Sequence, residues 1–181
     1  MDNKELALAC REIAAHFEGD VAVTAFEYYD AINKHFFNGE LPQAFIIMGI
    51  TPYGRCIGLT KHYFKQPIIL LHVGLKTEQE RFYTLLHEAI HVQVRYVLEY
   101  TGEKSHDSDE WLSEVNRIAP ILGYHEASLA ADKVRRRPKS EGGKLVRVQT
   151  GSLPYECSYT FPHALPKHTH QPLPPFEQWL V

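Results

Sequence analysis

The chain has 181 residues, of which 44% are hydrophobic, and its formal net charge at pH 7 is −3. This length predicts one domain, or one domain followed by a tail, and the hydrophobic content excludes a chain that is disordered throughout. The small negative charge excludes a protein that is basic over its whole length, so any contact with nucleic acid would need a local basic patch.

Two features of the composition indicate a cytoplasmic protein. The N-terminal stretch MDNKELALACREIAAHFEGD is interrupted by charges. It lacks the apolar core of a signal peptide, and no later run reaches the roughly 18 apolar residues of a membrane span. The cysteines are 3 in number and far apart, which argues against a disulfide framework. We therefore expect a cytoplasmic location and no membrane contact, while the oligomeric state is left open.

Helices are predicted at the start of the chain. Apolar residues recur at helical spacing over Lys4–Phe17 and again over Ala22–Phe37. Asp20 is a candidate N-cap of the second helix. Gly39 can adopt the left-handed conformation that ends it.

Three strands are predicted next, over Ala44–Ile50, Arg55–Thr60 and Pro67–Val73. Turn residues separate them, and the links are short. Because a parallel crossover needs about a dozen residues or more, we expect a small, three-stranded and largely antiparallel sheet.

The second half of the folded part is predicted to be helical. Thr77, with a glutamate three residues later, forms a capping box that opens a helix over roughly Glu78–Tyr100. Asp107 or Ser108 can cap a last helix over about Asp109–Leu122. Strands flanked by helices at both ends predict an α+β fold.

The composition changes after about residue 131, so residues 1–131 are predicted to form the domain and residues 132–181 an extended tail rich in proline and histidine. A basic run opens this tail, with Lys133, Arg135, Arg136 and Arg137. Such a run could contact DNA phosphates, although a solvated linker is the simpler interpretation. Cys157 is the only cysteine beyond the domain, so the tail contains no four-cysteine zinc ribbon.

The motif His87-Glu88-Ala89-Ile90-His91 predicts a Zn²⁺ site. Residues four apart lie on one face of a helix, so both imidazoles can reach one cation. Glu88 then lies beside a zinc-bound water, where it can act as general base. Chance matches to the motif are common in a chain with 11 histidines. The predicted apolar helix around it strengthens the interpretation, because unpartnered polar groups would be costly there.

A catalytic zinc usually has three protein ligands, so a third ligand is expected. His106 is the leading candidate, because it follows a loop that reverses the chain. Glu110 and Glu114, on the next predicted helix, are the alternatives. Asp107 and Asp109 could accept hydrogen bonds from a ligand imidazole, but helix capping explains them equally well.

At these residues the chain resembles the SprT-like family, the group that includes Spartan. The resemblance covers about residues 20–123. The matching segments, in chain order, are Phe36–Pro42 (FFNGELP), Gly54–Gly58 (GRCIG), Thr84–His91 (TLLHEAIH), His106, Trp111 and Asn116–Ile118 (NRI). The resemblance implies a minigluzincin-like metalloprotease fold, with zinc on His87, His91 and His106 and with Glu88 as the catalytic carboxylate. It also implies activity on DNA-associated proteins.

Two functional hypotheses follow. The first is a zinc-dependent metalloendopeptidase that hydrolyses peptide bonds with a zinc-activated water and with Glu88 as general base. The second is a DNA- or protein-binding module in which the zinc is structural. The basic run and the Asp107-Ser108 pair after His106, where the family often has Gly-Pro, motivate the second hypothesis.

Overall fold

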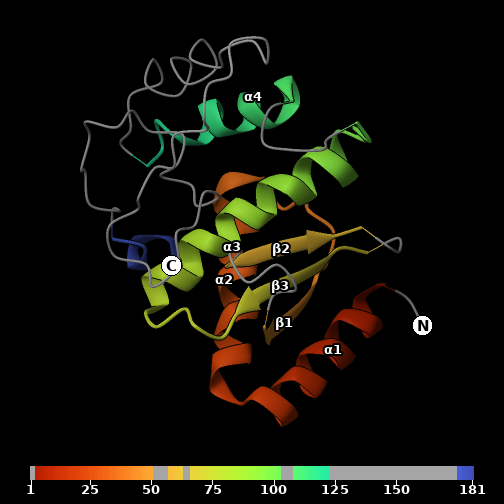
Figure 1. The fold of residues 1–181 in the computed structure, drawn as a ribbon, viewed down its shortest axis with the longest axis vertical. Helices are drawn as coiled ribbons and strands as arrows, with labels where there is room; N and C mark the ends of the chain where they lie inside the picture. The colour runs from red at the N-terminus through yellow and green to blue at the C-terminus, as the bar shows by residue number, and fades with distance from the viewer. Residues whose placement is uncertain (1–2, 51–56, 63–65, 103–107, 123–174) are drawn as a thin grey trace, which may run out of the picture.

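Helices and a small mixed sheet form an α+β fold, which confirms the predicted class (Figure 1). The computed structural model describes residues 3–50, 57–62, 66–102, 108–122 and 175–181. The elements are α1 (Asn3–Glu18), α2 (Asp20–Phe36), β1 (Phe45–Gly49), β2 (Gly58–Lys61), β3 (Ile68–His72), α3 (Glu78–Val92), the π-helical turn η1 (Gln93–Val97), α4 (Asp109–Ile118) and the 3₁₀ turn η4 (Glu177–Trp179). Among these described helices, none combines the length and the apolar character that crossing a bilayer requires.

The sheet has the strand order β1-β3-β2 and is mixed. β2 pairs with β3 in antiparallel fashion, as expected, but β1 runs parallel to β3. The prediction of a largely antiparallel sheet was therefore wrong for β1. It assumed that neighbours in sequence pair with each other. The chain from β1 to β3 instead includes all of β2, and a connection of that length can return in parallel.

The sheet buries one face against α2 and α3. Ile46, Ile69 and Leu71 lie on this face and are almost fully buried. Ile47, on the opposite face of β1, is 44% exposed. α1 packs beside β1, and the Glu18 carboxylate accepts a hydrogen bond of 3.2 Å from the main-chain N–H of Met48. This contact covers a donor at the sheet edge that could otherwise pair with another chain.

The ends of α2 differ in detail from the prediction. Gly19 is the N-cap, with φ 67°, and Asp20 is the first helical residue rather than the cap. Gly39 follows the helix with a φ of 78°. Buried Asn33 then fixes the exit of the chain, because its side chain both accepts from the main-chain N–H of Leu41 and donates to the carbonyl of Leu41.

α3 begins as predicted but ends earlier. The Thr77–Glu80 capping box is present in full. Regular α-helix ends at Val92 and passes into η1, where the N–H of Leu98 donates to the carbonyl of Gln93. Glu99 then has a φ of 53°, a left-handed conformation that stops a helix short of the predicted Tyr100.

α4 is capped by Ser108, whose hydroxyl accepts a 3.1 Å hydrogen bond from the N–H of Trp111. This confirms one of the two predicted caps, and the other, Asp107, lies outside the described residues. The helix ends at Ile118 rather than at the predicted Leu122.

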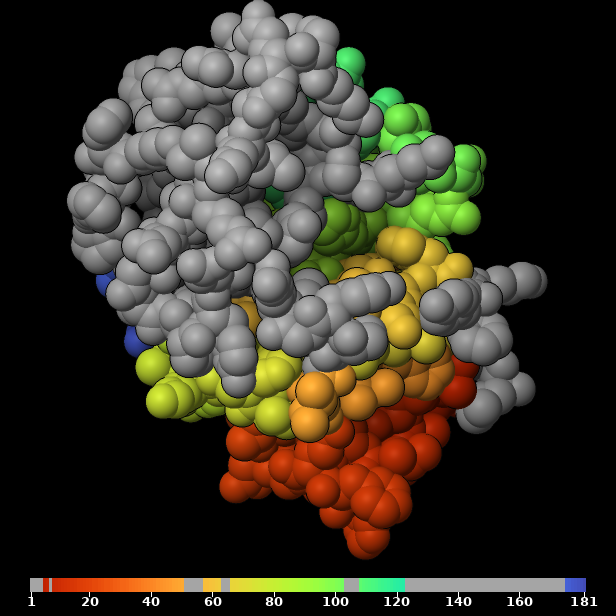
Figure 2. Space-filling view, in the orientation of Figure 1, coloured from red at the N-terminus to blue at the C-terminus, as the bar shows by residue number. Residues whose placement is uncertain are grey.

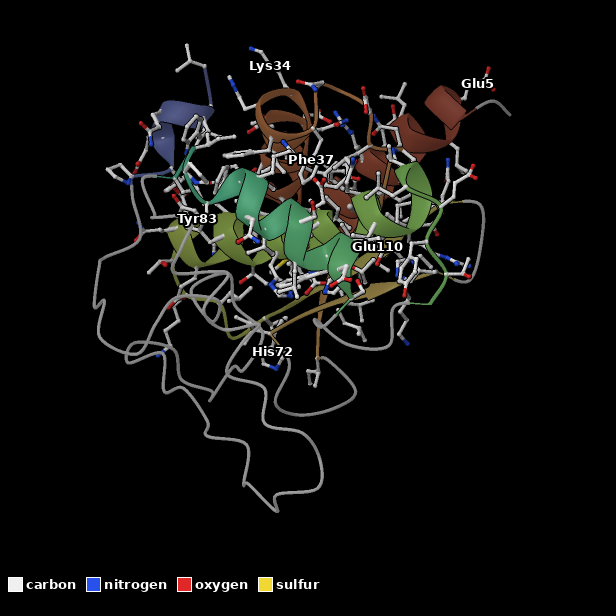
Figure 3. The ribbon with its side chains drawn as sticks, turned by 90° about the horizontal axis from the view of Figure 1, so that it is seen from above. Glu5, Lys34, Phe37, His72, Tyr83 and Glu110 are labelled. Atoms are coloured by element: carbon white, nitrogen blue, oxygen red, sulfur yellow. The ribbon has the colours of Figure 1, made fainter. Side chains whose placement is uncertain are left out.

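The last residues of the predicted tail pack on the domain. Phe176 is 4% exposed and its ring contacts those of Tyr28 and Phe82. Trp179 packs against Phe36. Figure 3 shows Lys34 at the end of α2 beside this C-terminal segment, and its ammonium donates to the carbonyl of Val181. The boundary near residue 131 lies outside the described residues and stays a prediction.

Replacing Phe176 by Ala should destabilise the domain, because it removes a buried ring from the aromatic contact between α2 and α3. We expect a loss of about 3 kcal/mol in the free energy of unfolding, measured by urea denaturation. Leu180→Ala is the matched control, since Leu180 is 44% exposed on the same segment. Equal effects of the two substitutions would show that the segment does not dock as described.

Candidate metal centre

The two imidazoles of the sequence motif meet on α3. His87 and His91 lie one helical turn apart, and their Nε2 atoms are 3.3 Å apart. The rings are nearly perpendicular, with an interplanar angle of 67°. His87 is buried and His91 is partly exposed. The helix therefore presents two nitrogen donors that converge at one point.

This separation fits a tetrahedral zinc ion. Two zinc–nitrogen bonds of about 2.0–2.1 Å that meet at the tetrahedral angle place their nitrogen atoms roughly 3.3 Å apart. The Nε2 atoms of His87 and His91 have that separation. It is longer than the usual range of about 2.7–3.2 Å for a hydrogen bond donated by N–H. The arrangement of the two rings is thus compatible with a shared cation.

Trp111 of α4 holds both rings from the side. Its ring centroid lies 5.6 Å from that of His87 and 5.9 Å from that of His91. α3 lies between the sheet and α4, so this indole closes the site on the side away from the sheet (Figure 1). Contacts with a rigid, buried aromatic ring restrict the rotation of both imidazoles.

Glu88 points to the other side, toward β2. Its side chain is almost fully buried, at 3% exposure. The Thr60 hydroxyl donates to its Oε2 atom at 2.6 Å. A Cβ atom placed on Gly58 would lie only 2.5 Å from Oε1. The carboxylate is therefore enclosed by β2, one residue along the helix from the first imidazole.

The third predicted ligand, His106, lies outside the described residues. Within the ranges that the structure covers, no three His, Cys, Asp or Glu side chains gather closely enough to hold a metal. The carboxylate of Glu114 accepts hydrogen bonds from Arg117, at 2.6 Å from Nη2. Glu110 lies in the first turn of α4 and is partly exposed (Figure 3). Glu114 is therefore engaged by Arg117 in this structure, and the choice among His106, Glu110 and Glu114 stays a prediction.

The basic run Lys133–Arg137 also lies outside the described residues, so the contact with DNA stays a prediction. Asp109, weighed earlier as a partner of a ligand imidazole, is the first residue of α4 and is exposed.

Sequence reasoning missed the surroundings of the motif. It gave Trp111 no role at the site, whereas the ring faces both imidazoles. It placed Gly58 and Thr60 in a predicted strand and gave neither a contact with Glu88. A glycine inside a strand was an available signal, because such a glycine often marks a close approach by another group.

We expect the purified protein to bind one Zn²⁺, and His87→Ala or His91→Ala to weaken that binding more than about 100-fold. Even residues that only support a ligand contribute roughly 10–100-fold to metal affinity. Competition with a zinc chelator measures the affinity. His16→Ala is the control, because His16 is exposed on α1. If both motif variants bound Zn²⁺ with the wild-type affinity, His87 and His91 would not be ligands.

A second set of variants identifies the third ligand. His106→Ala should lose zinc, whereas Glu110→Ala and Glu114→Ala should keep it, since Glu114 is already paired with Arg117. Metal analysis of the three purified proteins is the measurement. Zinc lost from a glutamate variant but kept in His106→Ala would assign the ligand to α4.

Comparison of the chain with known proteins adds no family or relative to these observations. No family model matches the chain. No curated protein and no solved structure matches it either.

Proposed function

We propose that the protein is a zinc-dependent metalloendopeptidase of the SprT-like type with a minigluzincin-like core. The observation that carries this proposal is the convergence of the two Nε2 atoms at 3.3 Å, with a buried carboxylate on the adjacent residue. His87 and His91 would hold the zinc, and His106 would complete the set.

The chemistry needs a nucleophile, a proton acceptor and stabilisation of negative charge. Bound zinc would supply a Lewis acid that polarises a carbonyl and lowers the pKa of a water molecule. Glu88 would accept the proton of that water and pass it to the leaving amine. Its burial supports this role, because interactions of a carboxylate are strong where water is excluded.

The position of the site suits an extended peptide. β2 is the edge strand of the sheet, on the side away from β1. In the space-filling view, β2 (gold) lies beside the green C-terminal part of α3 and η1 (Figure 2). An extended segment can add to an edge strand through main-chain hydrogen bonds, which favours proteins over small molecules as substrates. The resemblance extends this proposal to DNA-associated proteins.

Replacing Glu88 by Gln should lower kcat about 10²–10⁴-fold, the usual contribution of a positioned general base. Zinc should remain bound at full stoichiometry, because Glu88 is not a ligand. The assay is cleavage of casein and of a DNA-bound protein, with and without a chelator. Glu78→Gln is the control, on the exposed first turn of the same helix.

The two functional hypotheses predict different outcomes of this experiment. If the wild-type protein binds zinc but cleaves neither substrate, and if Glu88→Gln changes nothing but stability, the zinc is structural. Chelator-sensitive cleavage that depends on Glu88 supports the peptidase.

A further inference from the structure

We propose that β2 orients the Glu88 carboxylate: Thr60 holds one of its oxygens, and Gly58 provides the space for the other. This makes Thr60 and Gly58 positioning residues for the reaction. The inference rests on the proposed function and deepens it, because it assigns a second element of the fold to the same site.

The register of the sheet places both residues under α3. Thr60 pairs with Ile69, and Gly58 pairs with Leu71. Ile69 and Leu71 are fully buried on the face that α2 and α3 cover. Residues that are paired across adjacent strands point to the same face of the sheet. A hydroxyl and a glycine thus occupy positions where the adjacent strand has Ile and Leu.

The Thr60 hydroxyl has one proton to donate, and two Glu88 oxygens lie within reach. The carboxylate oxygen Oε2 is 2.6 Å away, and the main-chain carbonyl oxygen is 3.3 Å away. A hydroxyl donating to an ionised carboxylate typically gives a short bond of about 2.5–2.7 Å. The distances therefore assign the proton to Oε2, where the bond holds the side chain of Glu88 against β2.

Lack of space, rather than backbone conformation, explains why position 58 needs a glycine. The φ angle of Gly58 lies outside the left-handed range. A Cβ atom at this position would meet Glu88 Oε1 at 2.5 Å and Thr84 Cγ2 at 2.7 Å. Both atoms belong to α3, one turn apart, so neither can move away without shifting the helix or turning the carboxylate. Any side chain at residue 58 would displace the proposed base.

A fixed carboxylate matters because general-base catalysis depends on position. The hydrogen bond from Thr60 and the close approach of Gly58 reduce the rotamers that Glu88 can adopt. A displacement of about 1 Å in a catalytic group can cost roughly 100-fold in rate.

The first test compares Thr60→Val with Thr60→Ser. Valine keeps the shape of the side chain and removes the donor, and serine keeps the donor. We expect Thr60→Val to lower kcat about 10–100-fold with KM and bound zinc unchanged, and Thr60→Ser to recover most of the rate. Equal losses in both variants would indicate a packing role only and would overturn the proposal.

The second test needs no catalysis. Thermal unfolding is measured for Thr60→Val, Glu88→Ala and the double variant. If the hydroxyl holds the carboxylate, Thr60→Val should lower Tm by about 3 °C in the wild-type background and by much less when Glu88 is absent. Additive shifts would overturn the proposal. Coupled shifts in a protein without peptidase activity would support the orientation and count against the proposed function alone.

A third test addresses Gly58, with another glycine of the sheet as the matched control. Gly58→Ala should displace Glu88 and lower kcat at least tenfold, about the effect of a misplaced base. Gly49→Ala, in β1 of the same sheet, should leave kcat unchanged, because a Cβ there has no neighbour within 4 Å. Similar activity in the two variants would show that Gly58 does not shape the site.

Discussion

The site depends on the burial of ionisable groups along one helix. α3 buries His87 and Glu88 between the sheet and α4, and their neighbours Leu86 and Ala89 are among the α3 residues that are fully buried in the core. Moving a carboxylate out of water costs several kcal/mol unless it is compensated by hydrogen bonds or charge. Thr60 provides one hydrogen bond to that carboxylate. A cation between the imidazoles would provide the opposite charge. The geometry of α3 is therefore compatible with the proposed metal site.

The two edges of the sheet have different roles in this arrangement. At the β1 edge, α1 packs alongside and Glu18 accepts from the N–H of Met48, which stabilises and covers the strand. At the β2 edge, Thr60 and Gly58 contact the proposed base. One small sheet thus combines a structural edge with an edge that would position the proposed general base, and α3 packs against β2 at the second edge.

Local signals in the sequence predicted the helices well. The Thr77–Glu80 pair predicted the start of α3 because a capping box is a property of adjacent residues. The order of the strands was missed, because pairing of β1 with β3 is set by packing far apart in sequence. The π turn after Val92 was missed too, since Val94 and Val97 continue the apolar pattern that predicted an α-helix.

At the candidate site too, features set by neighbouring residues could be predicted from the sequence, and contacts between distant elements could not. The spacing of His87 and His91 follows from helix geometry and could be read from the sequence. The contacts with Trp111 and Thr60 could not, because each depends on how another element packs against α3. Glycine at position 58 was the one trace of this packing in the sequence, and its meaning became clear only beside the Glu88 carboxylate.

The central claim is that both imidazoles of α3 bind a single zinc ion directly. X-ray absorption spectroscopy of the protein loaded with one equivalent of Zn²⁺ tests it without any assay of activity. We expect a first shell with nitrogen at about 2.0–2.1 Å, together with the outer-shell scattering of at least two imidazole rings. A shell of oxygen atoms without imidazole scattering would contradict the account.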